Sequence, residues 1–466
     1  MRAIIIGAGK IGYQIADTLV KENIDVVVID SNEQIVSKVN ENLDVLAIHA
    51  NGLIGKTLRE LGVNGEDLVV AVTGSDEGNI LACLSARHMG AGGTIARIRN
   101  PAYAKDLALT KESLSIDYVI NPEKATAAEI SRLLDFSPAG QIEEFAKGKV
   151  QMVELPVEAD NPFLDMPLRD YNGFKNILIA AVSRAGELVI PKGDTVLRAE
   201  DNIFVVGKKP ALADFCKYIG KTPKRIRDVM IMGGGRITSY LAEYLHRQGI
   251  AIKVIEKDPQ RARELSEEIP YALVINGDGT DVELLQAENI AGMDAFVTVT
   301  GIDEENALMA LLAKQLGAKK VVSKVNRQGY ISLVENIGVD AVITPSLITA
   351  SEVLRFIRGD KLVSLSFLLG GQAEIMEISV APASSALNIP LHRLSLPRDV
   401  IITTIIRGEE IIVPHGNDRI LENDRIIVIC RASETEKVRR LFIGREGKEH
   451  IGYWNSHSDA RTAAGN

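Results

Sequence analysis

Short apolar runs alternate with stretches of helical spacing along the first part of the chain. The runs lie at 3–6, 25–29, 45–48, 68–72, 94–98 and 118–120. Between the first two runs, Ile11, Ile15, Ala16 and Leu19 fall on one face of a helix. Short strands that are apolar throughout and alternate with helices are typical of a parallel sheet covered on both faces. With right-handed crossovers, the pattern predicts an α/β fold with a doubly wound, Rossmann-type sheet.

The same pattern returns in the second half of the chain, with apolar runs at 229–232, 252–255, 273–275, 295–299, 320–325 and 341–343. Polar residues recur with it at a nearly constant offset. The matched pairs are Asp30 and Glu256, Asn51 and Asp278, Thr73 and Thr300, Asp76 and Asp303, Asn79 and Asn306, Arg97 and Lys324, and Tyr103 and Tyr330. A repeat of this length indicates two copies of one nucleotide-binding fold.

A smaller unit follows each Rossmann-type copy, at about 148–220 and 362–443. In both units a Pro-x-Gly turn, at Pro191 and again at Pro414, precedes a β-branched run, and a helix-like segment follows. We therefore expect two small α/β domains. The predicted domains are 1–125, 140–224, 226–348 and 362–444, followed by a loose tail at 445–466.

A proline closes the last strand of each large domain and opens a helix, at Pro122 and at Pro345. Both helices carry an apolar stripe that needs a covering surface. The stripes comprise Ala127, Ile130, Leu133 and Leu134 in one helix, and Ile348, Val353, Leu354 and Ile357 in the other. The neighbouring domain or a second subunit can supply that surface, and the sequence pattern favours the second subunit.

Composition narrows the setting in which this fold works. The chain has 466 residues, 25% of them charged, and a net charge of −9, which argues against nucleic acid as a partner. Its three cysteines, Cys83, Cys216 and Cys430, are far apart, so neither a disulfide framework nor a metal cluster is expected. With no signal peptide and no apolar run of about 20 residues, we expect a cytoplasmic protein whose membrane role requires a partner.

The first glycine loop follows the first strand directly. It consists of Gly7, Ala8, Gly9, Lys10, Ile11 and Gly12. In such a loop the first glycine allows the tight turn, the second admits a pyrophosphate, and the third lets helix and strand pack closely. The start of the following helix, at Lys10 and Ile11, then presents free N–H groups to phosphate. These residues are predicted to bind nucleotide; the alternative is a structural remnant without a ligand.

Asp30 ends the second strand, where a carboxylate accepts hydrogen bonds from both ribose hydroxyls. It favours NAD over NADP but does not separate NAD from ATP. Asn51 and Thr73 follow the third and fourth strands, where side chains reach adenine or phosphate, and Gly74 is assigned to the same site. Arg97, near the end of the fifth strand, is predicted to reach a phosphate, with a surface salt bridge as the alternative.

The second glycine loop departs from the glycine motif at its third glycine. Gly233, Gly234 and Gly235 are followed by Arg236 and Ile237, but Thr238 replaces the third glycine of the motif. We expect helix and strand to sit slightly further apart there. The predicted binding residues of this site are Gly233, Gly234, Gly235, Arg236, Ile237, Glu256, Asp278, Thr300 and Lys324. The alternative is a repeat that has lost its ligand.

No catalytic residue is predicted. Dehydrogenases need a general acid or base over the substrate, and neither His49 nor His88 nor His246 lies in a recognisable catalytic phrase. The sequence also lacks a Ser-His-Asp phrase, an HExxH motif and a Walker-type lysine loop. Sensing of a nucleotide is therefore favoured over its turnover. The alternatives are an NAD-dependent oxidoreductase and a nucleotide-sensing scaffold without a membrane partner.

The domain order and motifs resemble the TrkA-type peripheral regulatory subunits of Trk potassium uptake systems, with their tandem RCK or KTN domains. The similar segments are the first glycine loop, the run from Thr73 to Asn79, and the run from Arg97 to Pro101. The resemblance implies a cytoplasmic homo-oligomer, usually a tetramer, docked on a multi-span potassium-channel subunit. It also implies NAD(H) and ATP or ADP as regulatory ligands that change the shape of a ring and so gate the channel.

Overall fold

A computed structural model of the chain describes residues 1–100, 103, 116–135, 142–146, 148–170, 176–221, 226–358 and 362–443. The chain forms two compact units. The first comprises residues 1–126 together with helix α14 (Pro345–Arg358), and the second begins at residue 127 and holds both small sheets and the second large sheet. The tail predicted at 445–466 lies outside the described residues.

The first large sheet has six parallel strands in the order β3-β2-β1-β4-β5-β6. The strands are β1 (Arg2–Ile6), β2 (Asp25–Asp30), β3 (Leu46–His49), β4 (Asp67–Ala71), β5 (Gly93–Arg97) and β6 (Tyr118–Ile120). Their centres are fully buried, as Ile4, Val28 and Val70 show. The strand order reverses between β1 and β4, and this switch point opens a crevice at their carboxyl ends.

Helices connect these strands, and local capping explains where several of them begin. They are α1 (Lys10–Lys21), α2 (Glu33–Asn42), α3 (Gly55–Glu60) and α4 (Asp76–His88). The Asn32 side chain accepts hydrogen bonds from two N–H groups at the start of α2, and the Ser75 hydroxyl accepts one, from Gly78, at the start of α4. In α1 the predicted apolar face at Ile15, Ala16 and Leu19 is fully buried.

The second large sheet repeats this topology in the order β14-β13-β12-β15-β16-β17. Its strands are β12 (Asp228–Met232), β13 (Ala251–Glu256), β14 (Leu273–Asn276), β15 (Ala295–Thr298), β16 (Lys320–Lys324) and β17 (Ala341–Ile343). Its helices are α9 (Arg236–Arg247), α10 (Pro259–Glu268), α11 (Val282–Ala287), α12 (Asp303–Gln315) and α13 (Gln328–Asn336). The predicted doubly wound fold is confirmed, and each predicted strand is displaced by at most one residue at either end.

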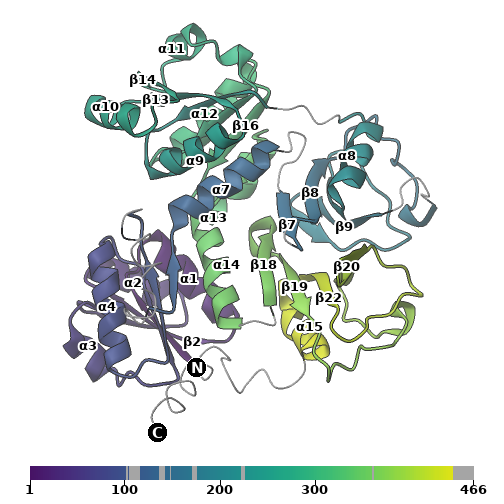
Figure 1. Cartoon of the computed structure of the whole chain (residues 1–466), viewed down its shortest axis with the longest axis horizontal. Coiled ribbons are helices and arrows are strands. Elements are labelled where there is room, and N and C mark those ends of the chain that lie inside the picture. The colour runs from purple at the N-terminus through teal and green to yellow at the C-terminus, as the bar shows by residue number, and fades with distance from the viewer. Residues whose placement is uncertain are drawn as a thin grey trace. The chain divides into compact units, whose positions relative to one another are not determined.

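Each small unit is a five-stranded antiparallel sheet followed by a helix, in keeping with the predicted small α/β domains (Figure 1). The first has the order β10-β9-β11-β8-β7, and the second β18-β19-β22-β20-β21. The first contains β7 (Ile142–Phe145), β8 (Val150–Pro156), β9 (Ile177–Arg184), β10 (Glu187–Val189), β11 (Asn202–Gly207) and α8 (Lys209–Tyr218). The second contains β18 (Leu362–Leu368), β19 (Ala373–Ser379), β20 (Val400–Arg407), β21 (Glu410–Ile412), β22 (Arg425–Arg431) and α15 (Thr435–Phe442).

The two small sheets share one hydrophobic core. Phe204 and Val206 of β11 lie in the same buried cluster as Ile427 and Ile429 of β22. Polar contacts join the sheets as well, since the backbone N–H of Ala146 donates to the Glu377 carboxylate at 3.0 Å. The sequence pattern treats the small domains as separate, but they form a single packed body.

The chain itself covers the two apolar helices that follow the large sheets. In α7 (Pro122–Asp135), the stripe residues Ala127, Ile130, Leu133 and Leu134 are at most 1% exposed. The Lys320 ammonium and the Gln248 side chain of the second large domain hydrogen-bond to the end of this helix. Helix α14, from the second half of the sequence, packs along α1 of the first large domain.

The expectation that a second subunit covers these stripes is therefore wrong for the buried positions. Val353 and Leu354 of α14 are also at most 1% exposed within one chain. Each helix leaves the sheet that precedes it in sequence and packs on the other half, and this exchange buries the four stripe residues of α7 and two of the four in α14.

Candidate functional site

The glycine loop after β1 is shaped by two close approaches. Gly7 has φ +97°, and a Cβ added to it would lie 3.0 Å from the backbone of Thr73. A Cβ on Gly12 would lie only 1.9 Å from the carbonyl oxygen of Gly7. The space in front of Gly9 is open, with nothing within 4 Å of a built Cβ. This is the geometry in which a phosphate approaches the backbone of the middle glycine.

Helix α1 begins directly behind this open space. Its N-cap residue, Gly9, provides no side-chain cap, and the first backbone hydrogen bond runs from the Tyr13 N–H to the Gly9 carbonyl. The N–H groups of Lys10 and Ile11 belong to the first turn, where a helix has no internal acceptors for its donors. The start of α1 is thus suited to hold an anion.

The acid at the end of the second strand is tied to the glycine loop in both large domains. Asp30 Oδ2 accepts the N–H of Ala8 at 2.7 Å, and Glu256 Oε2 accepts the N–H of Gly234 at 2.5 Å. The other oxygen of each acid accepts a second backbone N–H, from Asn32 at 2.8 Å and from Asp258 at 2.8 Å. Each carboxylate is therefore held at the rim of its cradle with lone pairs left for a ribose.

The second residue of each glycine loop differs between the two domains, and so does the acid that it contacts: Ala8 pairs with Asp30, and Gly234 pairs with Glu256. A Cβ on Gly234 would lie 2.8 Å from Glu256 Oε2 and 3.1 Å from Glu256 Cβ. The first domain has the shorter Asp30 and tolerates the methyl group of Ala8. The longer acid of the second domain thus depends on the missing side chain at Gly234.

Thr73 and Thr300 are turned toward a buried asparagine. Asn79 Oδ1 accepts the N–H and the hydroxyl of Thr73 at 2.8 Å and 2.7 Å, and Asn306 does the same for Thr300 at 2.9 Å and 2.8 Å. Both asparagines are 0% exposed. Each threonine hydroxyl therefore uses its proton on the asparagine, and it can contact a ligand only as a hydrogen-bond acceptor.

Asn79 and Asn306 also fix the next strand, because their amides donate to the main-chain carbonyls of Arg97 and Lys324 at 2.8 Å and 3.1 Å. They were absent from the predicted site, although their recurrence in both halves of the sequence marked them. They hold the loop between the fourth strand and its helix against the end of the fifth strand.

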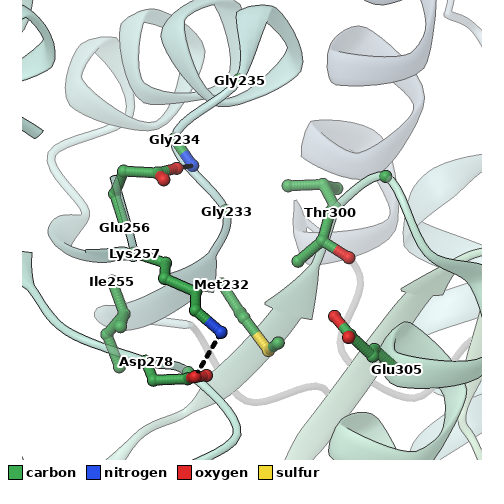
Figure 2. Close-up of a pocket in the computed structure, with 13 residues that line it drawn as sticks. Met232, Gly233, Gly234, Gly235, Ile255, Glu256, Lys257, Asp278, Thr300 and Glu305 are labelled. Carbon is green, nitrogen blue, oxygen red and sulfur yellow. Dashed lines mark hydrogen bonds and ion pairs between the residues drawn. The ribbon is translucent and has the colours of Figure 1, made fainter. Parts of the chain in front are cut away.

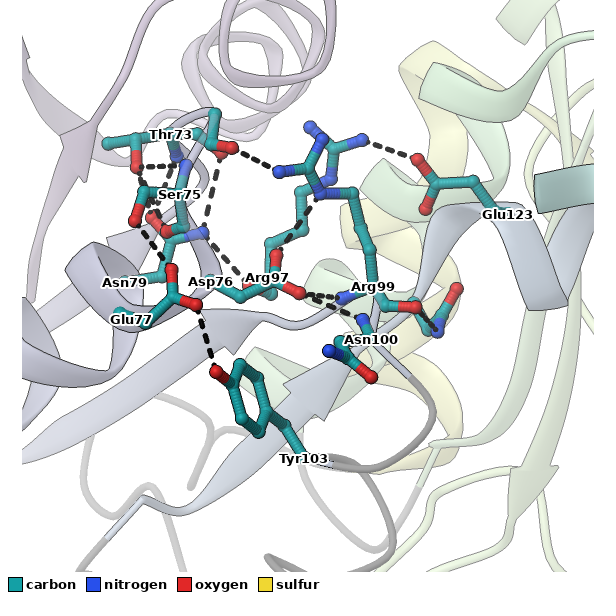
Figure 3. A network of polar contacts seen from close by, with 12 residues as sticks. Thr73, Ser75, Asp76, Glu77, Asn79, Arg97, Arg99, Asn100, Tyr103 and Glu123 are labelled. Atoms are coloured by element: carbon teal, nitrogen blue, oxygen red, sulfur yellow. Dashed lines mark hydrogen bonds and ion pairs between the residues drawn. The ribbon is translucent and has the colours of Figure 1, made fainter. Parts of the chain in front are cut away.

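Asp76, in the first turn of α4, also holds the loop that contains Thr73 and Gly74 (Figure 3). Asp76 accepts the N–H groups of Arg99 and Asn100 at 2.9 Å and 2.8 Å, and the Arg99 guanidinium at 3.1 Å. Burial by itself would raise the pKa of Asp76, but these donors lower it overall. Arg99 also donates to the carbonyl of Gly74, which ties this predicted site residue to the network.

Arg97 faces an acid rather than open solvent. Its Nη2 lies 2.7 Å from Glu123 Oε1 at the start of α7, and the two side chains are 15% and 17% exposed. The alternative of a salt bridge is therefore realised, although the pair is largely buried instead of lying on the surface. Its predicted contact with phosphate stays a prediction. Asn51 is likewise engaged locally, accepting the N–H of Leu53 at 3.0 Å.

The second domain holds a cavity of about 310 Å³ at the switch point of its sheet (Figure 2). It is lined by Met232, Gly233, Gly234, Gly235, Ile255, Glu256, Lys257, Asp278, Gly279, Val299, Thr300, Gly301 and Glu305. Gly233 has φ +105° and packs against the backbone of Thr300, as Gly7 does against Thr73. The cavity thus brings together the predicted residues Gly233, Gly234, Gly235, Glu256, Asp278 and Thr300.

Three predicted residues of this site lie outside the lining. Arg236 and Ile237 begin α9 next to the loop, while Lys324 contributes its carbonyl to Asn306. Thr238 is fully buried, and its hydroxyl donates to the carbonyl of Gly233. A side chain therefore replaces the close contact that Gly12 makes in the first domain.

An ion pair at the cavity has no counterpart in the first domain. Lys257 Nζ lies 2.6 Å from Asp278 Oδ2. The hydrogen bond from Lys257, together with those from Thr280, lowers the pKa of Asp278 to about 2. Asp278 is therefore ionised at any pH at which a cell operates.

Two of the histidines considered in the sequence, His49 and His246, make local contacts. His49 Nε2 lies 3.0 Å from the carbonyl of Ser31, and His246 stacks on Tyr271 with ring centroids 4.0 Å apart. Among the described residues, no group of three His, Cys, Asp or Glu side chains is placed to hold a metal ion. Nor does any helix within the described ranges have the length and apolarity to cross a membrane.

Comparison with known proteins shows what these features are similar to. The TrkA-N domain family matches residues 3–122 and 229–345, and the TrkA-C domain family matches residues 152–220 and 375–443. A Trk system potassium uptake protein TrkA homolog of Methanosarcina mazei is 37% identical over 450 residues, covering 95% of this chain and 100% of that protein. The TrkA protein of Vibrio alginolyticus is 34% identical over 453 residues, covering 95% of this chain and 98% of its own.

Solved structures share the fold. A GsuK channel bound to NAD superposes with a TM-score of 0.58 at 20% identity, covering 95% of this chain and 79% of that one. The GsuK RCK domain gives a TM-score of 0.58 at 19% identity and covers 95% of both chains. The alternation of large and small domains is therefore a known architecture.

Proposed function

The chain belongs to the TrkA family of Trk system potassium uptake proteins, and we propose that it is the nucleotide-sensing regulatory subunit of such a system. In this proposal it gates a multi-span potassium-channel subunit from the cytoplasmic face of the membrane. NAD(H) and ATP or ADP are the regulatory ligands, and the working form is a homo-oligomer, with a tetramer as the expected number. No chemical conversion of the nucleotide is involved.

The paired cradles carry this proposal. Both large domains place an open glycine loop, a helix start and a fixed carboxylate at the switch point of a parallel sheet. That arrangement suits the phosphates and ribose of an adenine nucleotide. The lining of the second cavity contains no histidine, and His49 of the first domain contacts the backbone carbonyl of Ser31, so binding is better supported than acid–base catalysis.

A chain of contacts leads from the first cradle to an exchanged helix. The Thr73 loop is held by Asn79, Asn79 bonds to the Arg97 carbonyl, and the Arg97 guanidinium pairs with Glu123 at the start of α7. Helix α7 continues into the part of the chain that forms the second unit. A nucleotide that prefers one position of this loop would bias the helix, and through it the regulatory state.

Gly9→Asp and Gly235→Asp test the proposal one cradle at a time. Both built Cβ atoms meet nothing within 4 Å, so the substitutions should not disturb folding, whereas the new carboxylate repels phosphate. A ligand at about 100 times its Kd stabilises a protein by roughly 2.7 kcal/mol. Each variant should lose the stabilisation that binding at the substituted cradle provides. Thermal unfolding with and without ATP or NADH measures this loss.

Gly329→Asp is the matched control, because its Cβ position is also open and lies outside the cavity lining. It should retain full nucleotide stabilisation. Potassium flux through vesicles that contain the channel subunit provides the functional readout. Equal flux with ATP, with NADH and without nucleotide would contradict the proposal, as would a wild-type protein that no adenine nucleotide stabilises.

A further inference from the structure

We infer that the second cradle selects adenine nucleotides of low charge, such as NAD⁺, and rejects the bare triphosphate, and that Glu305 is the residue that makes this distinction. The inference rests on the proposed function of this cavity as a nucleotide site. It adds that the two cradles differ in ligand preference: the first binds ATP readily, and the second prefers NAD⁺.

The ionic lining of the second cavity is acidic. Glu256, Asp278 and Glu305 contribute carboxylates, and Lys257 contributes the opposing charge. That ammonium pairs with Asp278 at 2.6 Å, and its single positive charge stands against three carboxylates, so the four groups carry a net negative charge. Incoming phosphate groups are therefore attracted by the N-terminus of α9 but repelled by the net negative charge of these side chains.

The first domain lacks this excess charge. At the positions equivalent to Lys257, Asp278 and Glu305, its sequence has Ser31, Asn51 and Gly78. Asp30 is then the only acid of the four matched positions in that domain. The basic residue at the helix start is kept in both, as Lys10 and Arg236. The two cradles thus share their phosphate-binding backbone but differ in the charge around it.

Glu305 is well placed to act on phosphate. It lies in the first turn of α12 and lines the cavity near Thr300, across from Glu256 (Figure 2). The two acids before it are engaged elsewhere, because Asp303 accepts the N–H groups of Asn326 and Arg327, and Glu304 pairs with Arg327. Among the described residues, no hydrogen bond or ion pair neutralises the Glu305 carboxylate.

Charge then discriminates between ligands that share adenosine. ATP brings a triphosphate, whereas NAD⁺ brings two phosphate charges, one of which its nicotinamide cation offsets. A carboxylate within several ångströms of the phosphates, in a partly screened cavity, changes affinity for the more highly charged ligand by about tenfold. The same carboxylate should change NAD⁺ affinity by about threefold or less.

The experiment uses the full-length protein with Gly9→Asp, so that only the second cradle binds. Calorimetric titrations with ATP and with NAD⁺, in buffer containing EDTA, compare this background with the same protein carrying Glu305→Gln. We expect ATP affinity to rise about tenfold and NAD⁺ affinity to stay within about threefold. Glu304→Gln is the matched control, since Glu304 adjoins Glu305 but does not line the cavity, and it should change neither affinity.

The reciprocal experiment places the charge in the first cradle. In a Gly235→Asp background, Gly78→Glu should weaken ATP binding about tenfold. A Cβ at Gly78 would lie 3.0 Å from Leu53 Cδ1, so Gly78→Ala is needed to separate packing from charge.

Three results overturn or redirect the inference. Unchanged ATP affinity in Glu305→Gln, with binding otherwise intact, refutes the role of Glu305 while leaving the nucleotide site in place. Loss of affinity for ATP supplied with Mg²⁺ would mean that the carboxylate holds the cation, which also refutes it. Absence of any nucleotide binding in the Gly9→Asp background would refute the proposed second site itself.

Discussion

Gly12 and Thr238 occupy equivalent positions in the two glycine loops, yet they meet the same carbonyl differently. A Cβ on Gly12 would collide with the Gly7 carbonyl at 1.9 Å, whereas the Thr238 hydroxyl donates a hydrogen bond to the Gly233 carbonyl. In each cradle, the residue at one position thus suits the particular neighbours that it contacts. A substitution in one cradle therefore does not carry over directly to the other.

The pair of Gly234 and Glu256 offers a direct test of such compensation. Gly234→Ala places a Cβ 2.8 Å from Glu256 Oε2, which should destabilise the protein by about 1–2 kcal/mol. Glu256→Asp shortens the acid and should recover the part of that loss caused by Glu256, whereas the 3.0 Å approach of the new Cβ to Leu265 Cδ2 stays. A double-mutant cycle by urea unfolding should give a coupling of about 1 kcal/mol. Strictly additive effects would show that the two positions are independent.

At the scale of elements, the exchanged helices connect the two halves of the sequence. Helix α14 packs on α1, and the end of α7 is held by Lys320 and Gln248 of the second large domain. The Lys320 ammonium is 4% exposed and donates to the carbonyl of Leu133 at 2.6 Å. A cation at a helix C-terminus is favourable, but its removal from water opposes that gain.

This buried ammonium predicts a pH dependence of stability. Burial lowers the pKa of Lys320 to about 7, below the value of about 10.4 in an unfolded chain. Between these two values the unfolded state binds more protons, so stability rises with pH. From pH of about 7 to about 9, the unfolding free energy should increase by about 2 kcal/mol relative to Lys320→Met, as measured by urea unfolding.

Lys319→Met is the control for that measurement. Lys319 is exposed and pairs with Asp294 at 2.6 Å, so its removal should leave the pH dependence intact. If Lys320→Met and the wild-type protein show parallel pH profiles, the ammonium is not desolvated in the way we describe.

At the scale of the whole molecule, the two copies of the sequence repeat do not form two independent domains. The two large sheets lie in separate compact units, whereas the two small sheets share one core. Phe204 of the first small sheet belongs to this shared core together with Ile427 and Ile429 of the second. Damage to one small sheet should therefore reach the other.

Phe204→Ala should expose this coupling. Truncation of a fully buried phenylalanine costs about 3–5 kcal/mol, and hydrogen exchange should accelerate in β22 as well as in β11. Phe215→Ala is the matched control, because Phe215 is equally buried but stacks on Phe163 within the first small domain. Faster exchange confined to the first small sheet in both variants would argue that the sheets unfold separately.

Much of this architecture could be predicted because local patterns determine it. Short apolar runs such as 3–6, directly followed by glycine loops, indicate buried strands, and Pro122 and Pro345 begin their helices as expected. The residues around the cradle were harder. The sequence did not show that Arg97 pairs with Glu123, and it did not show that the Asn79 side chain joins Thr73 to the Arg97 carbonyl of β5.

The sequence by itself determined that this protein has two Rossmann-type cradles, each followed by a small domain, because hydrophobic periodicity and glycine spacing act over short stretches of chain. Only the tertiary structure decided which helix covers which sheet, that the small sheets share a core, and that Glu305 lines one cradle where Gly78 has no side chain to offer. Those features depend on contacts between residues distant in sequence, and no local pattern encodes them.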